Sequence, residues 1–450
     1  MPDPTSLQNC HLIAHRGGRP VVLRGESLSI VNGVIGAKTR PDAREQAIDA
    51  SRHIIIPGLI NTHHHLYQSL TRGLKCVQDA PLFGWLTELY KRWRNINYEA
   101  VKLAAQISIA ELQFSGCTTT SDHFYIFPQG TDTRLEAVLD AAEEMGMRIH
   151  ACRGSMSVGH SKGGLPPDDC VEDEQIILRD CERALDRFHD PSPHSRRRID
   201  LAPCSPFSVS PELMRDAAIM ARERGALLHT HAAETLDEER YCLERFKMRP
   251  IELLDSLGWL GPDVYLAHCV HVSEADVKRL AETNTGIAHC PSSNMRLGSG
   301  IPPIRALLDA GARVGLGVDG SSSNDGGHLL GEARQALLLQ RVSGGASAMS
   351  VAEAFTLGTL GSAAVLNRPL LGNIEEGCTA DLAMFRRDDL ALAGAIEQDP
   401  LGALMLCRTA RVDRLIINGR TVIKNGEHQL VDLPVLIERF NKLVRASFVD

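Results

Sequence analysis

The 450-residue chain is long enough for one large domain with a smaller appendage. Its composition, 43% hydrophobic and 23% charged, is that of an ordinary globular enzyme. The net charge of -8 at pH 7 argues against nucleic acid as a main partner, because phosphate binding needs a basic face.

The sequence indicates neither membrane insertion nor secretion. No apolar run reaches the length of a membrane-spanning helix, and residues 1–9 lack the charged-then-apolar layout of a signal peptide. None of the 12 cysteines belongs to a C-x-x-C pair, and several lie in apolar runs, where cysteine acts as a small buried hydrophobe. We therefore expect reduced thiols, a cytoplasmic location and a small-molecule substrate, with no nucleic-acid or membrane partner.

Short strands and tight turns mark both ends of the chain. Asn32-Gly33 separates the apolar segments 28–31 and 34–35, and Asn418-Gly419 separates 414–417 and 420–423. An Asn-Gly pair accepts the positive φ angles of a tight hairpin turn. The two ends are therefore predicted to pair into one small β-sandwich domain, made of residues 1–57 and 371–450.

The middle of the chain, residues 58–370, alternates apolar strands with amphipathic helices. Leu103, Ile107, Ala110 and Phe114 recur on one helix face. Ser210-Pro211 is a helix start that Gly225 would end. Eight strand–helix units in line favour a closed (β/α)8 barrel, in which catalytic groups follow the C-terminal ends of strands. The predicted strands are 53–60, 117–123, 148–153, 199–204, 226–231, 264–268, 285–290 and 313–319.

Histidines gather where the first predicted strand ends, in Asn61-Thr62-His63-His64-His65. Alternate side chains of a strand share a face, so His63 and His65 point together and His64 points away. Two imidazoles on one face form half of a divalent-metal site, which suits zinc, iron or nickel. A polar strand end is the alternative interpretation.

Later strands of the predicted barrel end on further polar groups. His231 ends the fifth strand, and Glu234 follows closely enough to move a proton of a water at the same opening. His268 ends the sixth strand, where a supporting or substrate-side role is favoured over metal binding. Asp319 ends the eighth, and a carboxylate there is costly to bury unless it meets a cation. Together these residues predict one metal centre at the barrel mouth.

Two motif matches fail on their context. Residues 315–320 satisfy the dinucleotide fingerprint G-x-G-x-x-G, but they lie in the last strand–helix unit and no helix opens on the final glycine. Residues 159–163 satisfy the serine-hydrolase pattern G-x-S-x-G, but Gly164-Leu165-Pro166-Pro167 follows where a helix is required. The H-x-E and P-C-x-x-C motifs of nucleic-acid-type zinc deaminases are absent, so a deaminase would use another scaffold.

These segments together resemble the amidohydrolase superfamily over nearly the whole chain. The resemblance rests on 57–65, His231 with Glu234, Ala267-His268, 289–294, 317–319 and 372–382. The His-x-x-Glu pairing, with no bridging lysine at the fourth strand, is similar to the mononuclear branch that contains cytosine and guanine deaminases. Residues 64–72, 82–86, 121–123 and 153–157 are similar to its members that deaminate 8-oxoguanine. Relatives acting on isoxanthopterin or hydroxylated s-triazines share much of this pattern.

The resemblance implies a metal-dependent aminohydrolase with one Zn2+, or Fe2+, in each subunit of a homo-oligomer. Glu234 would take a proton from the metal-bound water and deliver it to a ring nitrogen, while His268 and Asp319 would orient the attacking water. A non-catalytic binding scaffold is the alternative from another class, and the intact set of polar residues argues against it. The residues expected to hold the metal are His63, His65, His231 and Asp319, and those expected to contact the substrate are Gln68, Trp85, His123, Arg153 and Cys204.

Overall fold

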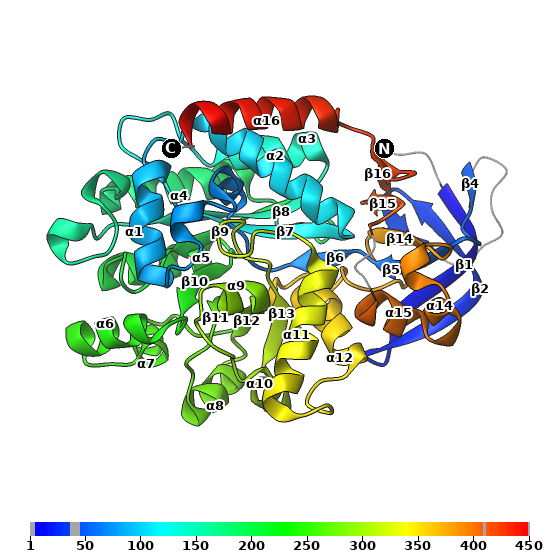
Figure 1. The fold of residues 1–450 in the computed structure, drawn as a ribbon. Helices are drawn as coiled ribbons and strands as arrows, with labels where there is room; N and C mark the ends of the chain where they lie inside the picture. Colours follow the sequence, from blue (N-terminus) through cyan, green and yellow to red (C-terminus); the bar gives the residue numbers. More distant parts are fainter. Residues whose placement is uncertain (1–4, 37–45, 408–410, 449–450) are drawn as a thin grey trace.

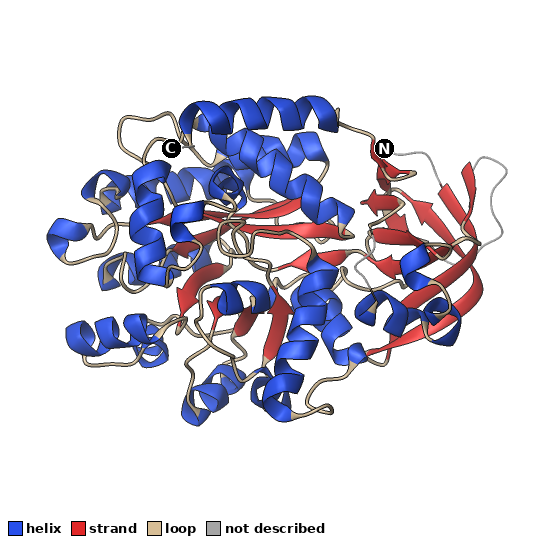
Figure 2. Ribbon diagram, viewed as in Figure 1, coloured by secondary structure: helices blue, strands red, loops and turns tan. Residues whose placement is uncertain are grey.

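The computed structural model describes residues 5–36, 46–407 and 411–448. A barrel of parallel strands lies at the centre, helices surround it, and a sheet lies to one side (Figures 1 and 2). This arrangement confirms the predicted fold class. Within the described ranges no helix is long and apolar enough to cross a membrane.

Nine described strands from the two ends of the chain form one mixed sheet, which carries its own cluster of buried apolar side chains. The central pair is β5 with β14, which run antiparallel and join the two ends of the chain. The predicted boundaries at residues 57 and 371 remain predictions, and residues 1–4, 37–45, 408–410 and 449–450 of the predicted terminal domain lie outside the described part. The strands are β1 (Thr5–Arg16), β2 (Arg19–Val31), β3 (Val34–Ile35), β4 (Gln46–Asp49), β5 (His53–Pro57), β14 (Leu382–Arg386), β15 (Arg414–Ile417), β16 (Arg420–Lys424) and β17 (Glu427–His428).

Both predicted Asn-Gly turns are present in this sheet. Asn32-Gly33, between β2 and β3, has φ angles of 52° and 80°, and Asn418-Gly419, between β15 and β16, has 51° and 76°. The two turns also touch each other, because a Cβ added to Gly33 would lie 2.7 Å from the carbonyl oxygen of Asn418. A third Asn-Gly pair, Asn425-Gly426, joins β16 to β17 in the same left-handed conformation and was not predicted.

Eight parallel strands close into the barrel, and every predicted strand contributes to the structure. The first predicted strand is corrected, because it divides at Gly58 into β5 of the terminal sheet and β6 of the barrel. Gly58 lies where the chain crosses between the two sheets, and an added Cβ would lie 2.2 Å from Oγ1 of Thr118. The barrel strands are β6 (Leu59–Asn61), β7 (Cys117–Phe124), β8 (Arg148–Ser155), β9 (Arg197–Pro203), β10 (Leu228–Ala232), β11 (Val264–His268), β12 (Gly286–His289) and β13 (Arg313–Leu316).

The helices follow the strands in the expected alternation. The predicted apolar face at residues 103–114 lies in α2 (Tyr98–Phe114), and Ser210 caps α5 (Pro211–Glu223) by accepting a hydrogen bond from the Leu213 amide at 3.0 Å. The C-terminal helix α16 leaves the sheet and lies along α2 (Figure 1). The other helices are α1 (Leu82–Trp93), α3 (Glu136–Met145), α4 (Glu174–Phe188), α6 (Leu236–Phe246), α7 (Pro250–Ser256), α8 (Glu274–Glu282), α9 (Pro291–Arg296), α10 (Ile304–Asp309), α11 (Leu329–Gly344), α12 (Val351–Thr356), α13 (Ser362–Val365), α14 (Ala395–Gln398), α15 (Pro400–Leu406) and α16 (Leu433–Ser447).

Candidate active site

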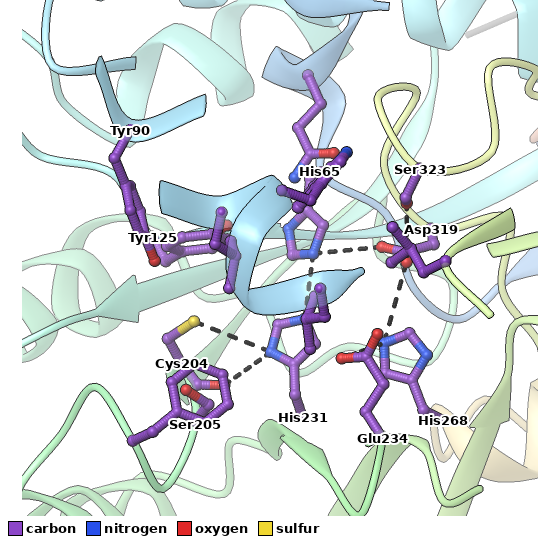
Figure 3. Close-up of a pocket in the computed structure, with 16 residues that line it drawn as sticks. His65, Tyr90, Tyr125, Cys204, Ser205, His231, Glu234, His268, Asp319 and Ser323 are labelled. Carbon is purple, nitrogen blue, oxygen red and sulfur yellow. Dashed lines mark hydrogen bonds and ion pairs between the residues drawn. The ribbon is translucent and has the colours of Figure 1, made fainter. Parts of the chain in front are cut away.

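The C-terminal ends of the barrel strands bring the predicted metal ligands to one place. His63 and His65 follow β6, His231 lies in β10 and Asp319 follows β13. Oδ1 of Asp319 lies 3.3 Å from Nε2 of His63 and 3.4 Å from Nε2 of His65. Nε2 of His65 lies 3.1 Å from Nε2 of His231, and Figure 3 shows this row of side chains from Asp319 to His231. Four groups distant in the sequence therefore converge within the buried mouth of the barrel.

A chain of hydrogen bonds fixes the tautomer of His63. The carbonyl oxygen of Tyr265 can only accept, so His229 donates to it through Nδ1 at 2.8 Å. Burial lowers the pKa of His229 well below its usual value, which keeps the ring neutral and its Nε2 without a proton. His63 Nδ1 therefore donates to this nitrogen at 2.8 Å. Burial likewise keeps His63 neutral, so its Nε2 carries a lone pair that faces the Asp319 carboxylate without a hydrogen-bond partner.

Backbone carbonyls fix the other two imidazoles in the same tautomer. His65 Nδ1 donates to the carbonyl of His123 at 2.6 Å, and His231 Nδ1 donates to the carbonyl of Cys204 at 2.7 Å. Burial lowers the pKa of His65, and it lowers that of His231 to about 3. Their two Nε2 atoms, 3.1 Å apart, are thus both acceptors and repel each other.

The donor set fits a divalent cation. Three unprotonated imidazole nitrogens and one carboxylate converge with no proton between them, and a cation converts that repulsion into attraction. Imidazole nitrogen with carboxylate oxygen is a common ligand set for Zn2+, and iron accepts it too.

Hydrogen bonds hold the Asp319 carboxylate in place. Its Oδ1 accepts from the Gly320 amide at 2.7 Å, and its Oδ2 accepts from the hydroxyls of Ser293 at 2.6 Å and Ser323 at 3.1 Å. Asp319 itself has a φ of 62°, in the left-handed region. The turn after β13 is therefore shaped to direct this carboxylate toward the histidines.

Glu234 and His268 form a second buried pair beside the predicted ligands. Oε2 of Glu234 lies 3.6 Å from Nε2 of His268, which lies 3.9 Å from Oδ2 of Asp319 (Figure 3). His268 Nδ1 is 2.9 Å from the side-chain oxygen of Asn294, which accepts its hydrogen bond. Burial raises the pKa of Glu234 to about 7, so this carboxyl can exchange a proton near neutral pH. Burial lowers the pKa of His268, but the Glu234 and Asp319 carboxylates outweigh it and the net shift is upward.

A hollow opens beside these groups at the mouth of the barrel. Helix α1 supplies an apolar wall through Leu82, Trp85 and Leu86, while Tyr90, Tyr125 and Cys204 lie at the opposite side in Figure 3 from Asp319. The lining residues are His65, Gln68, Leu82, Trp85, Leu86, Tyr90, Tyr125, Cys204, Ser205, Phe207, His231, Glu234, His268, Leu297, Asp319 and Ser323.

Three of the five predicted substrate contacts line this hollow: Gln68, Trp85 and Cys204. The indole Nε1 of Trp85 donates to the Ser322 carbonyl at 3.1 Å, so Trp85 offers the hollow its apolar ring. The other two predicted contacts, His123 and Arg153, are placed elsewhere.

Arg153 and His123 lie outside the hollow, and their contact with substrate stays a prediction. Side chains alternate along β8, so Arg153 points away from the barrel interior, where it bonds Asp180 at 2.6 Å and Glu172 at 2.8 Å. His123 lies behind the ligands, where its Nε2 donates to the Ala202 carbonyl at 2.9 Å and its ring stacks on His231 at 4.7 Å. Neither side chain lines the hollow.

Several residues of the site were missed from the sequence. His229 shares the strand face of His231 by simple alternation, a pattern that would have identified it. Ser293 and Asn294 lie in the segment 289–294 that carried the family resemblance, although neither was given a role. Tyr90 and Phe207 come from a helix and a loop over the mouth, and no local pattern marks them.

Comparisons with known proteins agree with this geometry. Residues 54–422 match the model of the amidohydrolase family. An 8-oxoguanine deaminase from Pseudomonas aeruginosa is 49% identical over 391 residues, 87% of each chain. An isoxanthopterin deaminase from an unknown prokaryotic organism is 34% identical and covers 98% of this chain and 97% of its own. The solved structure of atrazine chlorohydrolase from Arthrobacter aurescens TC1 complexed with zinc superimposes with a TM-score of 0.93, at 32% identity, over 98% of this chain and 100% of its own.

Proposed function

Because the chain belongs to the amidohydrolase family, we propose that it is a zinc-dependent deaminase that converts 8-oxoguanine to urate and ammonia. The similarity of the chain to deaminases shows that it is a hydrolytic enzyme that acts on C–N bonds. The observation that carries the proposal is the Glu234–His268 pair beside three unprotonated imidazole nitrogens and the Asp319 carboxylate. The 49% identity to a deaminase of this purine supports the choice of substrate.

The metal set proposed here is His63, His65, His231 and Asp319. A divalent cation held by these residues would act as a Lewis acid and make a coordinated water more acidic at neutral pH. We propose one Zn2+ per chain, a choice supported by the zinc in the related atrazine chlorohydrolase structure, with Fe2+ as the alternative.

Glu234 is proposed as the group that moves protons. With a pKa of about 7 it can accept a proton from the attacking water and deliver it to a ring nitrogen of the substrate. His268, whose pKa is raised, donates a hydrogen bond to the oxygen as negative charge develops on it. Water oxygen then bonds to the carbon that bears the amino group. The second water proton reaches the amino nitrogen with the help of Asp319, the C–N bond breaks and ammonia leaves.

The hollow suits a planar heterocycle with ring oxygens. Burial raises the pKa of Tyr90 and the pKa of Tyr125 well above the usual value, so both phenols stay protonated. Each can donate to a carbonyl oxygen, although the Tyr90 hydroxyl would give up its 3.5 Å hydrogen bond to Sδ of Met156 to do so. The side-chain oxygen of Gln68 has no hydrogen-bond partner although it is buried, so it can accept from a ring N–H. Trp85 and Leu86 present apolar surface to the ring faces.

Two neighbouring functions are supported by particular relatives. Deamination of isoxanthopterin or another pterin, or of guanine, would use the same chemistry, and an isoxanthopterin deaminase covers almost this whole chain. Removal of an amine from an s-triazine is supported by the 36% identity, over 382 residues, to a hydroxydechloroatrazine ethylaminohydrolase from Pseudomonas sp. (strain ADP). A non-catalytic scaffold would need none of the buried groups described above.

A panel assay for released ammonia separates these functions. The purified protein is given 8-oxoguanine, guanine, isoxanthopterin and a hydroxylated s-triazine in parallel, and its metal content is measured. We expect the highest kcat/KM with 8-oxoguanine and about one metal ion per chain. Strong turnover of a pterin or s-triazine with none of 8-oxoguanine would reject the proposed substrate, whereas absence of stoichiometric metal would favour the scaffold.

A cytoplasmic location, a homo-oligomeric state and the absence of nucleic-acid or membrane partners remain proposals. The location is supported by the twelve cysteines, all of which are free in the structure.

A further inference from the structure

Glu238 is a fully buried carboxylate that contacts two consecutive backbone amides. It lies in the first turn of α6, and its side chain is 0% exposed. One oxygen accepts from the Ala233 amide at 2.9 Å and the other from the Glu234 amide at 2.8 Å. Both oxygens of this side chain are therefore engaged on the turn that carries Glu234.

That turn has a backbone conformation that its own residues do not favour. Ala233 has a φ of 52°, in the left-handed region, and alanine has no polar side chain to stabilise it there. A residue keeps such a conformation only where surrounding contacts impose it. The two hydrogen bonds to Glu238 are such contacts, because they fix the orientation of both peptide groups around Ala233.

The same peptide is held from its other side by the turn after β11. The carbonyl of Ala233 accepts from the amides of Val270 at 2.9 Å and His271 at 2.8 Å. These residues follow His268 and Cys269, which have φ angles of 75° and 48°. Ala233 thus connects the turn that carries Glu234 to the turn that carries His268.

We propose that Glu238 is a positioning residue for the reaction. It holds the Ala233–Glu234 turn so that the Glu234 carboxylate faces His268 and the hollow. Glu238 does not line the hollow, so it acts through Glu234 and does not touch the substrate. This inference rests on the proposed role of Glu234 as the proton carrier.

The position of Glu238 in its helix would by itself suggest only a helix-capping role. A glutamate in the first turn of a helix often reaches back to the amides around the cap. However, the cap of α6 is also made by Thr235, whose side chain accepts from the Glu238 amide at 3.4 Å. Thr235 therefore offers a matched control that weakens the same helix end without removing the two bonds to the Ala233–Glu234 turn.

The test compares Glu238→Gln and Glu238→Ala with two controls, Thr235→Ala and Glu239→Gln. The Glu239 side chain pairs with Arg249 at 2.9 Å, so Glu239→Gln removes a neighbouring carboxylate of the same helix. For each variant kcat, KM, metal content and melting temperature are measured on the metal-loaded protein. We expect Glu238→Gln to lower kcat by roughly 10–100-fold, with KM and metal content near those of the unmodified protein.

The controls separate positioning from folding. Thr235→Ala should lower the melting temperature while kcat stays within about threefold, and Glu239→Gln should change neither. If Glu238→Ala does not fold, Glu238→Gln carries the test, because it keeps the shape of the side chain. A crystal structure of Glu238→Gln should show Glu234 displaced from its position 3.6 Å from His268.

Two outcomes would overturn the inference. Unchanged kcat in both Glu238 variants would reject it. It would also be rejected if the Glu238 variants and Thr235→Ala lost the same melting temperature and the Glu238 variants lost no more kcat than Thr235→Ala. The proposed role of Glu234 is tested separately, by the variant Glu234→Gln. If that variant keeps normal turnover, Glu234 is not the proton carrier, whereas if it is inactive while the Glu238 variants are active, only the present inference is wrong.

Discussion

The terminal sheet and the barrel mouth both contain left-handed backbone, but at different residue types. In the described part of the sheet the non-glycine residues with positive φ are all asparagines, which tolerate this conformation through their own side chains. At the mouth two of them, Ala233 and Cys269, have no such side chain. The sheet residues are Asn9, Asn32, Asn418 and Asn425, and the mouth residues are Ala233, His268, Cys269 and Asp319.

The difference shows how each region is specified. A turn of the sheet is specified by two adjacent residues, Asn and Gly, so it forms wherever that pair stands between strands. The mouth is specified by partners far away in the sequence, such as the 268–271 turn that bonds Ala233. Changes in the sheet should therefore affect stability without chemistry, and changes at the mouth should affect chemistry first.

The largest effect is expected at a metal ligand. His63→Ala should abolish stoichiometric metal binding and reduce ammonia release to background. It should also lower the melting temperature, because a metal bound only to the folded protein stabilises that state. Metal analysis and thermal unfolding measure both effects, and full metal occupancy in this variant would remove His63 from the ligand set.

Glu234→Gln should separate chemistry from stability at the mouth. It removes the proton carrier and leaves the predicted ligands intact, so kcat should fall about 10²–10⁴-fold while metal content stays unchanged. The melting temperature should not fall, because the buried carboxyl, whose pKa burial raises to about 7, is replaced by a neutral group of the same shape. Near-normal turnover would show that another group moves the proton.

Arg153→Ala tests whether Arg153 contacts the substrate. The guanidinium bonds Glu172 and Asp180 outside the hollow. Its loss should therefore lower the free energy of unfolding by about 3 kcal/mol. This is the low end of the range for breaking a buried ion pair, because both carboxylates are partly exposed. KM for the substrate should not change. A tenfold rise in KM at normal stability would return Arg153 to the substrate contacts, and urea unfolding with steady-state kinetics decides between the two.

Gly33→Ala is the corresponding change in the sheet. Gly33 has a φ of 80°, and an added Cβ would lie 2.7 Å from the Asn418 carbonyl oxygen. Strain and overlap should lower the free energy of unfolding by about 1–3 kcal/mol, with kcat and KM unchanged. Loss of kcat in the folded variant would contradict the separation of the two regions.

The sheet should also respond to acid. Burial lowers the pKa of His15 in β1 and of His428 in β17 from 6.5 to about 4. Between pH 6.5 and about pH 4 the unfolded chain therefore binds more protons than the folded one. The free energy of unfolding is highest above about pH 6.5, where both imidazoles are neutral in both states, and it decreases as the pH falls to about 4. When the free energy of unfolding is measured across this range, it should depend less steeply on pH in His15→Gln than in the unmodified protein. An equally steep dependence in the variant would exclude His15 as its cause.

Much of the fold follows from local patterns in the sequence. Several barrel strands, such as β11 and β13, are largely apolar runs, and the ligands His63, His231 and Asp319 stand at or just after the ends of strands. The division of the first run at Gly58 was missed as a strand boundary, although Pro57-Gly58 interrupts the run and the predicted domain boundary lies there. The close approach of Gly58 to Thr118, a residue from another strand, has no signal in the sequence.

The composition of the hollow was less predictable than its metal ligands. Arg153 was assigned to it because it stands near a strand end, but the alternation along β8 turns the side chain outward. Glu238 stands in the acidic run Asp237-Glu238-Glu239, where nothing local distinguishes it from its half-buried neighbours. Such residues are identified only by what the folded chain brings against them.

The β5–β14 pairing has a consequence for synthesis on the ribosome. Ile54 lies opposite Phe385, and Pro57 opposite Leu382, so β5 must wait for more than 300 further residues to be translated before its partner exists. Until then one edge of this apolar strand has exposed amides and carbonyls, which are prone to pair with other nascent chains. Production of this protein should accordingly benefit from slower translation or from added chaperones, even though the finished barrel contains no open edge.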